Sequence, residues 1–270
     1  MNALEKLIRK NNEGKFICIG LDTDLNKLPA GVRDKPNPVF EFNKAIIEKC
    51  SDKAAAYKLN FAFYERDGLN GLKALEDTIA LIPDDILIIA DAKRGDIGNT
   101  SEMYAEAILE KMKFDSITVN PYMGTDSIAP FIKNPDKLTF ILALTSNAGA
   151  MDFEKQKLEN GLCLYQKVIE KVNEWNVKNN CGIVFGATKA EELHQNMDKI
   201  GTLPVLLPGV GAQGGSLEDV VKTFKEFNRK NFLINVSRGI IYKSGGDDYA
   251  EAALNEILRL NEAAGMLFNE

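Results

Sequence analysis

The chain has 270 residues, of which 45% are hydrophobic and 27% charged, and this composition is ordinary for a soluble globular protein. Its formal net charge of −6 argues against a nucleic-acid-binding scaffold, which would usually carry a basic face. We find no apolar segment long enough for a signal peptide or a membrane span, and the four cysteines form no CxxC pair or zinc-spaced cluster. We therefore expect a reduced, cytoplasmic protein that binds neither nucleic acid nor a membrane.

Short apolar runs alternate with longer amphipathic runs along the chain, after a short polar helix predicted at residues 4–9. Strands are predicted at 16–21, 54–60, 86–91, 116–120, 139–144, 182–186, 204–207 and 232–236. Helices are predicted at 38–50, 69–81, 99–112, 126–133, 161–176, 189–200, 216–228 and 249–264. Two of these helices begin with capping signatures, Asn99 with Glu102 and Ser216 with Asp219.

Eight strands, each followed by a helix, fit a single (β/α)8 TIM barrel, an α/β domain that spans residues 1–270 and includes the short N-terminal helix. No linker or low-complexity stretch divides the chain. A doubly wound open sheet is the alternative, but it would call for a GxGxxG fingerprint after the first strand, and Gly20-Leu21-Asp22 has no such loop. In a barrel the site lies at the carboxyl ends of the strands, so the polar residues there are the candidates.

The third strand ends in the densest group of charges, Asp91, Lys93, Arg94 and Asp96. Side chains alternate along a strand, so Asp91 and Lys93 are predicted to point to the same side. Charged side chains at the end of an apolar strand are costly to remove from water. A protein therefore keeps such residues mainly where they have a function. This favours an active site, and the alternative is a strand end whose charges pair in solvent.

The last two strands end in a pattern that is typical of a phosphate site. Glycines at 209, 211, 214 and 215 follow the seventh strand and allow backbone N–H groups to converge on an anion. Arg238 at the end of the eighth strand offers a bidentate donor, and barrels often bind phosphate between these two loops. The alternative is a flexible loop beside an ordinary surface arginine. The only histidine, His194, lies within a predicted helix, which disfavours histidine-based acid–base chemistry.

The segment Asp91-Ala-Lys-Arg-Gly-Asp-Ile-Gly-Asn-Thr100 resembles the signature of orotidine 5′-monophosphate decarboxylases, in the form typical of the longer bacterial branch of that family. Leu21-Asp22, Lys58, the 208–213 loop and the 237–239 segment fall where the family has them, so the resemblance spans nearly the whole chain. It implies decarboxylation of orotidine 5′-monophosphate to uridine 5′-monophosphate in de novo pyrimidine biosynthesis, without a metal or an organic cofactor.

The resemblance also implies roles for individual residues. Lys93 would protonate C6 of the pyrimidine, Asp91 would lie beside the substrate carboxylate, and Lys58 and Asp96 would complete an alternating charge network. The protein would be a homodimer with shared active sites, in which Asp96 and Thr100 reach the ribose bound by the partner subunit. The other implied contacts to this small nucleotide are Asp22 and Lys58 at the ribose, Gln213 and Arg238 at the phosphate and Ser146 at the pyrimidine, with Pro208 and Gly239 also in the substrate-binding set.

Two other functions stay open on the same barrel. Metal-dependent sugar-phosphate decarboxylases or aldolases, such as 3-keto-gulonate 6-phosphate decarboxylase, share the Asp-x-Lys-x-x-Asp pattern, but we expect a metal-binding carboxylate at the end of their second strand. Here that position is Lys58, a cation that would repel a divalent metal, and Glu65 falls in the next helix. A non-catalytic sensor of a phosphate ligand would leave the Asp91–Lys93 pair without a purpose. The polar segment 145–159 has no role that its sequence explains.

Overall fold

The computed structural model describes residues 1–211 and 214–269. The strands in this part of the chain are β1 (Ile17–Gly20), β2 (Ala56–Asn60), β3 (Leu87–Arg94), β4 (Ser116–Val119), β5 (Leu138–Leu144), β6 (Cys181–Phe185), β7 (Val205–Pro208) and β8 (Phe232–Val236). They pair in parallel and in sequence order, and β8 pairs with β1 to close a barrel. This confirms the predicted (β/α)8 barrel and excludes the open sheet, because a closed barrel has no edge strand.

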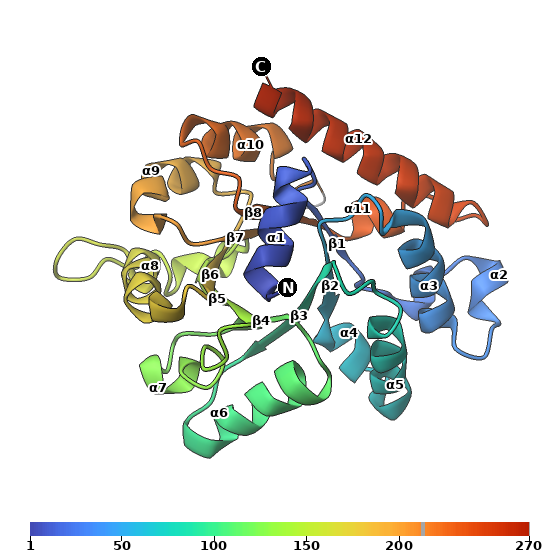
Figure 1. Ribbon diagram of the computed structural model, residues 1–270, viewed down its shortest axis with the longest axis horizontal. Helices are drawn as coiled ribbons and strands as arrows, with labels where there is room; N and C mark the ends of the chain where they lie inside the picture. Colours follow the sequence, from blue (N-terminus) through green and yellow to red (C-terminus); the bar gives the residue numbers. More distant parts are fainter. Residues whose placement is uncertain (212–213, 270) are drawn as a thin grey trace.

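An outer layer of helices surrounds the barrel (Figure 1). The longer ones are α3 (Pro38–Cys50), α5 (Gly68–Ile79), α6 (Gly98–Ala105), α8 (Leu164–Trp175), α9 (Ala190–Ile200), α10 (Leu217–Glu226) and α12 (Tyr249–Asn269). The connections contain α2 (Ala30–Arg33), α4 (Phe61–Glu65), α7 (Thr125–Ile128), α11 (Arg238–Ile241) and the 3₁₀ turns Leu25–Lys27, Ala148–Met151 and Asn176–Lys178. None of the described helices is long and apolar enough to cross a membrane.

Alternate residues of the strands divide the apolar core into a cluster inside the barrel and a cluster beneath the helices. In β3, Leu87 and Ile89 belong to the interior cluster, whereas Ile88 packs outward. Cys18 of β1 also lies in the interior, where burial raises the pKa of its thiol to about 12. Because strand side chains alternate, the inward series of β3 leads from Leu87 and Ile89 to Asp91 at the carboxyl end. The same strand therefore supplies the apolar floor of the barrel and a charge at its mouth.

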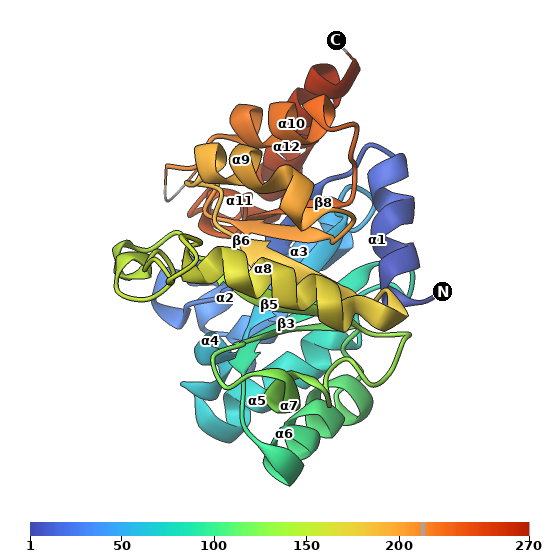
Figure 2. The same cartoon turned by 90° about the vertical axis from the view of Figure 1, so that its left-hand side faces the viewer.

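The amino-terminal end of the barrel is closed by α1 (Ala3–Asn12), which lies across it (Figure 1). Asn2 and Glu5 form a reciprocal capping box at its start, with both hydrogen bonds 2.9 Å long. Ala3 and Leu7 then pack into the interior cluster of the barrel. Figure 2 shows α1 at one end of the molecule and the loop after β5 at the opposite end. The floor is thus apolar, and the carboxyl end is left for a site.

Local details differ from the sequence pattern around α6. The helix begins at Gly98, its N-cap Ile97 offers no side-chain hydrogen bond, and Asn99 lies inside the first turn, so the predicted Asn99–Glu102 capping box is wrong. The π-helix Glu106–Lys111 follows α6 directly. The Ser216 cap is confirmed, since its hydroxyl accepts a hydrogen bond from the backbone N–H of Asp219 at 3.1 Å.

Replacing Leu7 by alanine tests whether α1 is an integral part of the barrel core. Leu7 is fully buried, so the variant should lose about 2–5 kcal/mol of the free energy of unfolding, because truncation leaves a cavity beneath the strands. Urea denaturation followed by circular dichroism measures this loss.

Ile8 is the matched control, since it is the next residue of the same helix and is 42% exposed. Ile8→Ala should change the free energy of unfolding by no more than about 0.5 kcal/mol. Equal losses in the two variants would show that α1 does not seal the barrel.

Candidate active site

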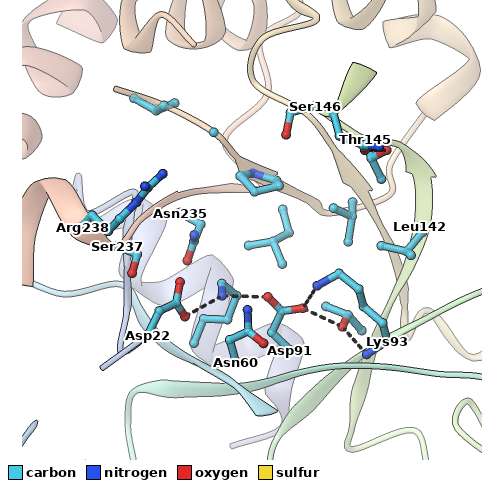
Figure 3. A pocket seen from close by; sticks show the side chains of 18 residues that line it. Asp22, Asn60, Asp91, Lys93, Leu142, Thr145, Ser146, Asn235, Ser237 and Arg238 are labelled. Carbon is cyan, nitrogen blue, oxygen red and sulfur yellow. Dashed lines mark hydrogen bonds and ion pairs between the residues drawn. The ribbon is translucent and has the colours of Figure 1, made fainter. Parts of the chain in front are cut away.

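The carboxyl ends of the strands surround a cavity of about 300 Å³, which is within the size range of small-molecule sites (Figure 3). Its lining comes from residues of β2 to β8 and from the segments that follow β1, β5, β7 and β8, so residues far apart in the sequence meet at one end of the barrel. The predicted site residues that line this cavity are Asp22, Lys58, Asp91, Lys93, Ser146, Pro208 and Arg238.

Four of these side chains form a row of alternating charge along one side of the cavity (Figure 3). The Lys58 ammonium lies 2.8 Å from one carboxylate oxygen of Asp91 and 3.5 Å from Asp22. The other Asp91 oxygen lies 2.5 Å from the Lys93 ammonium. The side chains of Lys58 and Asp91 are only 4% and 10% exposed, whereas that of Lys93 is 50% exposed. Both lysines line the cavity, and Lys93 is the more accessible of the two.

The pKa values of the two buried members shift in opposite directions. Burial disfavours the charge of Lys58, but Asp22 and Asp91 outweigh it and raise the pKa of the ammonium above its ordinary value. Burial also disfavours the charge of Asp91, but Lys58 and Lys93 outweigh it and hold the pKa of the carboxyl well below its usual range. Both groups are therefore ionised at neutral pH, and each depends on the other for its charge.

The backbone of Lys93 has a left-handed conformation, with φ of +47°. Such a conformation is uncommon for a residue with a side chain, and it is typical of functional sites that the surrounding structure holds in place. Here Thr118 of β4 holds it, because the Thr118 hydroxyl accepts the N–H of Lys93 at 3.0 Å and donates to Asp91 at 3.1 Å. The pairing of β3 with β4 shifts register at this point, between Ala90 and Arg94.

The predicted phosphate corner lies at the other side of the cavity in Figure 3, where Arg238 begins α11. Among the described residues, the side chain of Arg238 has no hydrogen-bond or ion-pair partner, so its guanidinium donors are available to a ligand. Pro208 and Gly209 line the cavity beside it, and Gly209 has φ of +103°, which a residue with a side chain rarely adopts. Gln213, predicted to bind the phosphate, lies outside the described residues.

Three predicted residues do not line this cavity. Asp96 accepts a hydrogen bond from the N–H of Ile97 at 2.8 Å, and no ion pair within the described chain joins it to Lys93. Thr100 is exposed on α6, and Gly239 follows Arg238 without reaching the cavity surface. The charge row of the described chain therefore consists of Asp22, Lys58, Asp91 and Lys93, without Asp96.

Several lining residues were not among the predicted site residues, namely Asn60, Thr118, Thr145, Asn147, Asn235 and Ser237. Asn235 of β8 is 8% exposed, and its side-chain oxygen has no hydrogen-bond partner in the described structure. The close approach of β8 requires a glycine on β1, because a Cβ on Gly20 would lie 2.8 Å from that of Ser237. The signal that could have found Asn235 and Ser237 is their place in the inward series of β8 after Leu233.

A divalent metal would meet a competing cation in this cavity. Asp22 and Asp91 are both engaged by Lys58, and Glu65 at the end of α4 forms an ion pair with Arg94. Within residues 1–211 and 214–269, no group of three or more histidine, cysteine, aspartate or glutamate side chains is placed to hold a metal ion.

Comparisons with known proteins agree with the geometry. The sequence model described as "Orotidine 5'-phosphate decarboxylase / HUMPS family" matches residues 15–253. The orotidine 5′-phosphate decarboxylase of Flavobacterium johnsoniae is 46% identical over 261 residues, which cover 96% of this chain and 94% of that protein. That of Christiangramia forsetii is 50% identical over 252 residues, which cover 92% of this chain and 91% of that protein.

A solved structure gives the same result at the level of the fold. The structure of Leishmania donovani OMP decarboxylase superimposes with a TM-score of 0.81 and 33% sequence identity, covering 97% of this chain and 99% of that one. Sequence and fold thus agree over nearly the full length, and the resemblance seen in the segment from Asp91 to Thr100 is confirmed. The chain belongs to the orotidine 5′-phosphate decarboxylase / HUMPS family.

Proposed function

We propose that this protein decarboxylates orotidine 5′-monophosphate to uridine 5′-monophosphate in pyrimidine biosynthesis, and that it does so in the cytoplasm. The observation that carries the proposal is the buried row of Asp22, Lys58, Asp91 and Lys93, which ends in an accessible ammonium. The names of its curated relatives support the same activity. They give no support to a metal-dependent sugar-phosphate enzyme or to a non-catalytic sensor.

The chemistry needs a group that stabilises negative charge on carbon and then supplies a proton. When the bond between C6 and the carboxylate breaks, carbon dioxide leaves and the electron pair stays on C6. A fixed ammonium such as Lys93 stabilises that charge and can donate its proton to C6, after which it regains a proton from solvent. Asp91, 2.5 Å away, forms an ion pair with Lys93 and directs its ammonium, and its own negative charge would lie beside the departing carboxylate.

The two ends of the cavity suit the two ends of the nucleotide. Figure 3 shows Arg238 and Ser146 at separate places on the cavity wall, with the charge row below both of them in this view. In this arrangement Arg238 would hold the phosphate, and Asp22 and Lys58 would bind the ribose. The family resemblance adds Gly239 and Gln213 to the proposed phosphate contacts. Ser146 would face the pyrimidine and Pro208 would form part of the wall. Binding of the remote phosphate would then help to position and desolvate the reacting ring.

We also propose that the protein is a homodimer in which Asp96 and Thr100 complete the partner's site. Both residues lie outside their own cavity, on the segment that leads from β3 into α6. Apolar side chains are exposed on this segment and on the neighbouring loop after β4, a pattern typical of an interaction surface. These side chains are Ile97, Met103, Tyr104, Tyr122 and Met123.

The activity itself is the first test. Purified protein should consume orotidine 5′-monophosphate, seen as loss of its absorbance, without added metal and in the presence of a chelator. Lys93→Ala should lower kcat at least about a hundredfold, because it removes the proton donor, while uridine 5′-monophosphate binding stays measurable by calorimetry.

Lys111 is the matched control, since its side chain is 75% exposed on the π-helix that continues α6. Lys111→Ala should keep the activity of the unmodified protein. Activity abolished by the chelator would contradict the metal-free mechanism. Turnover near the normal rate in Lys93→Ala would show that another group donates the proton.

Removing Lys58 should make the stability of the protein depend on pH in a defined direction. In the unmodified protein the pKa of Asp91 is lower in the folded state than in the unfolded state, where it is about 4. The ionised carboxylate therefore stabilises the fold above pH of about 4, and this stabilisation is lost as the pH falls through the pKa of the folded state. In Lys58→Met, Asp22 and Asp91 lose their shared cation, so the folded pKa of Asp91 should rise. We expect the variant to be less stable by about 3–5 kcal/mol at pH 7, and less so at pH 5, because protonation relieves the unpaired charge.

Urea denaturation at the two pH values measures this difference. Lys93→Met is the control, because that ammonium is half exposed and its loss should cost less and vary less with pH. A deficit in Lys58→Met that stays constant or grows as pH falls would contradict the assignment of Lys58 as the cation that keeps Asp91 ionised.

Mixing two inactive variants tests the shared site. Asp96→Asn and Lys93→Ala subunits should recover up to about a quarter of normal activity, because half of the randomly mixed dimers contain one intact site. Mixing Asp91→Asn with Lys93→Ala should recover nothing, since both residues serve their own subunit. Equal activities in the two mixtures would argue against a site that is shared through Asp96.

A further inference from the structure

The segment after β5, to which the sequence assigns no role, forms one wall of the cavity and then folds back on it. Thr145, Ser146 and Asn147 line the cavity directly after the end of β5, and we call them the 145–147 wall. One side of this wall is held by close packing, because a Cβ on Gly186 would lie 2.8 Å from the backbone nitrogen of Ser146.

The other side of the wall is held by Glu154. Its carboxylate accepts the backbone N–H of Thr145 at 2.7 Å, and the Thr145 hydroxyl lies 2.8 and 3.0 Å from its two oxygens. The same hydroxyl lies 2.6 Å from the side-chain oxygen of Asn147. Hydrogen bonds to a carboxylate are about twice as strong as neutral ones, so Glu154 replaces the strand partner that Thr145 lacks once β5 has ended.

Glu154 is itself fixed by an antiparallel ribbon of residues 154–165. The backbone N–H of Tyr165 donates to the carbonyl of Glu154 at 2.9 Å, and Lys157 pairs with Cys163 across the ribbon. The ribbon leads into α8, and the neighbouring Lys155 forms an ion pair with Glu192 of α9. The position of the Glu154 carboxylate is therefore set by two helices of the outer layer rather than by a free loop.

We propose that Glu154 is a positioning residue that holds the 145–147 wall in place for recognition of the pyrimidine base. Glu154 does not line the cavity, so it acts through Thr145 and not on the ligand. The proposal rests on the proposed function, because it takes Ser146 to face the pyrimidine. Its distinctive consequence is selectivity: loss of Glu154 should weaken contacts to the base and leave the phosphate corner at Arg238, on the other side of the cavity, unchanged (Figure 3).

The test compares a ligand that has the base with one that lacks it. Glu154→Ala should weaken binding of uridine 5′-monophosphate, measured by calorimetry, about tenfold, and raise KM for orotidine 5′-monophosphate to a similar extent. The inhibition constant of ribose 5-phosphate should stay within about twofold, since no contact at the phosphate or the ribose is touched. Glu154→Gln retains one acceptor oxygen for the Thr145 N–H and should recover most of the affinity.

Two further variants keep the test decisive. Thr145→Val replaces the hydroxyl by a methyl group, so it should show the same selective loss of uridine 5′-monophosphate affinity in a milder form, even if Glu154→Ala folds poorly. In the double variant with Glu154→Ala, it should cause little further loss of affinity. Glu159→Ala changes an exposed carboxylate in the turn of the same ribbon and should match the unmodified protein.

The outcomes separate the two proposals. Suppose that the unmodified protein turns over orotidine 5′-monophosphate, but Glu154→Ala weakens the binding of ribose 5-phosphate and of uridine 5′-monophosphate equally, or weakens the binding of neither. The positioning role is then overturned and the proposed function stands. If the unmodified protein neither binds uridine 5′-monophosphate nor turns over the substrate, the proposed function fails and the role of Glu154 falls with it.

Discussion

The pairing of one buried ammonium, that of Lys58, with two carboxylates is the interaction on which the rest of the site depends. An isolated charge at this depth would be neutralised or driven back to water, and neither Asp22 nor Asp91 could replace Lys58 as the other's partner. These three residues also tie together β1, β2 and β3, since Lys58 lies in β2, Asp91 lies in β3 and Asp22 follows β1. One carboxylate oxygen of Asp91 binds Lys58, and the other binds Lys93. The buried ammonium of Lys58 therefore fixes the position of the accessible ammonium of Lys93 through Asp91.

Lys93 shows how the barrel holds a conformation that a free chain would avoid. A left-handed backbone at a residue with a side chain costs about 1–3 kcal/mol, and it persists only where the surroundings enforce it. The Thr118 hydroxyl binds both the backbone of Lys93 and the carboxylate of Asp91, so one contact fixes the main chain and the charge partner together. β4 is itself paired with β3 and β5 in the closed barrel, and this pairing fixes the position of Thr118.

The sequence predicted the parts of the site that follow from periodicity. Strand alternation placed Asp91 and Lys93 on one side, and the barrel placed Asp22, Lys58 and Arg238 at the same end. The features of the site that could not be predicted depend on pairing between strands or on loops without regular secondary structure. The register shift opposite Thr118 is set by pairing with β4, and the Glu154–Thr145 contact depends on how a loop folds back.

The capping box expected at Asn99 failed for a related reason, because a short motif also fits a residue within the first turn of a helix that begins at Gly98. Asn235 could have been predicted, because it continues the inward series of β8 after Leu233, although it stands within an otherwise apolar run. By contrast, the Ser216 cap depends only on its own first turn, and it was predicted correctly.

The apolar floor beneath the charge row has an electrostatic consequence. Leu87, Ile89 and Leu7 of α1 keep water away from the underside of Lys58 and Asp91, so screening by solvent can come only from the mouth of the barrel. A ligand that displaces the water there removes that screening as well. Every electrostatic interaction among the charged side chains of the row from Asp22 to Lys93 then becomes stronger. The electric field across the bound ring therefore rises on binding, without any protein atom having to move. The helix that plugs the far end of the barrel thereby helps to set the field in which the reaction takes place.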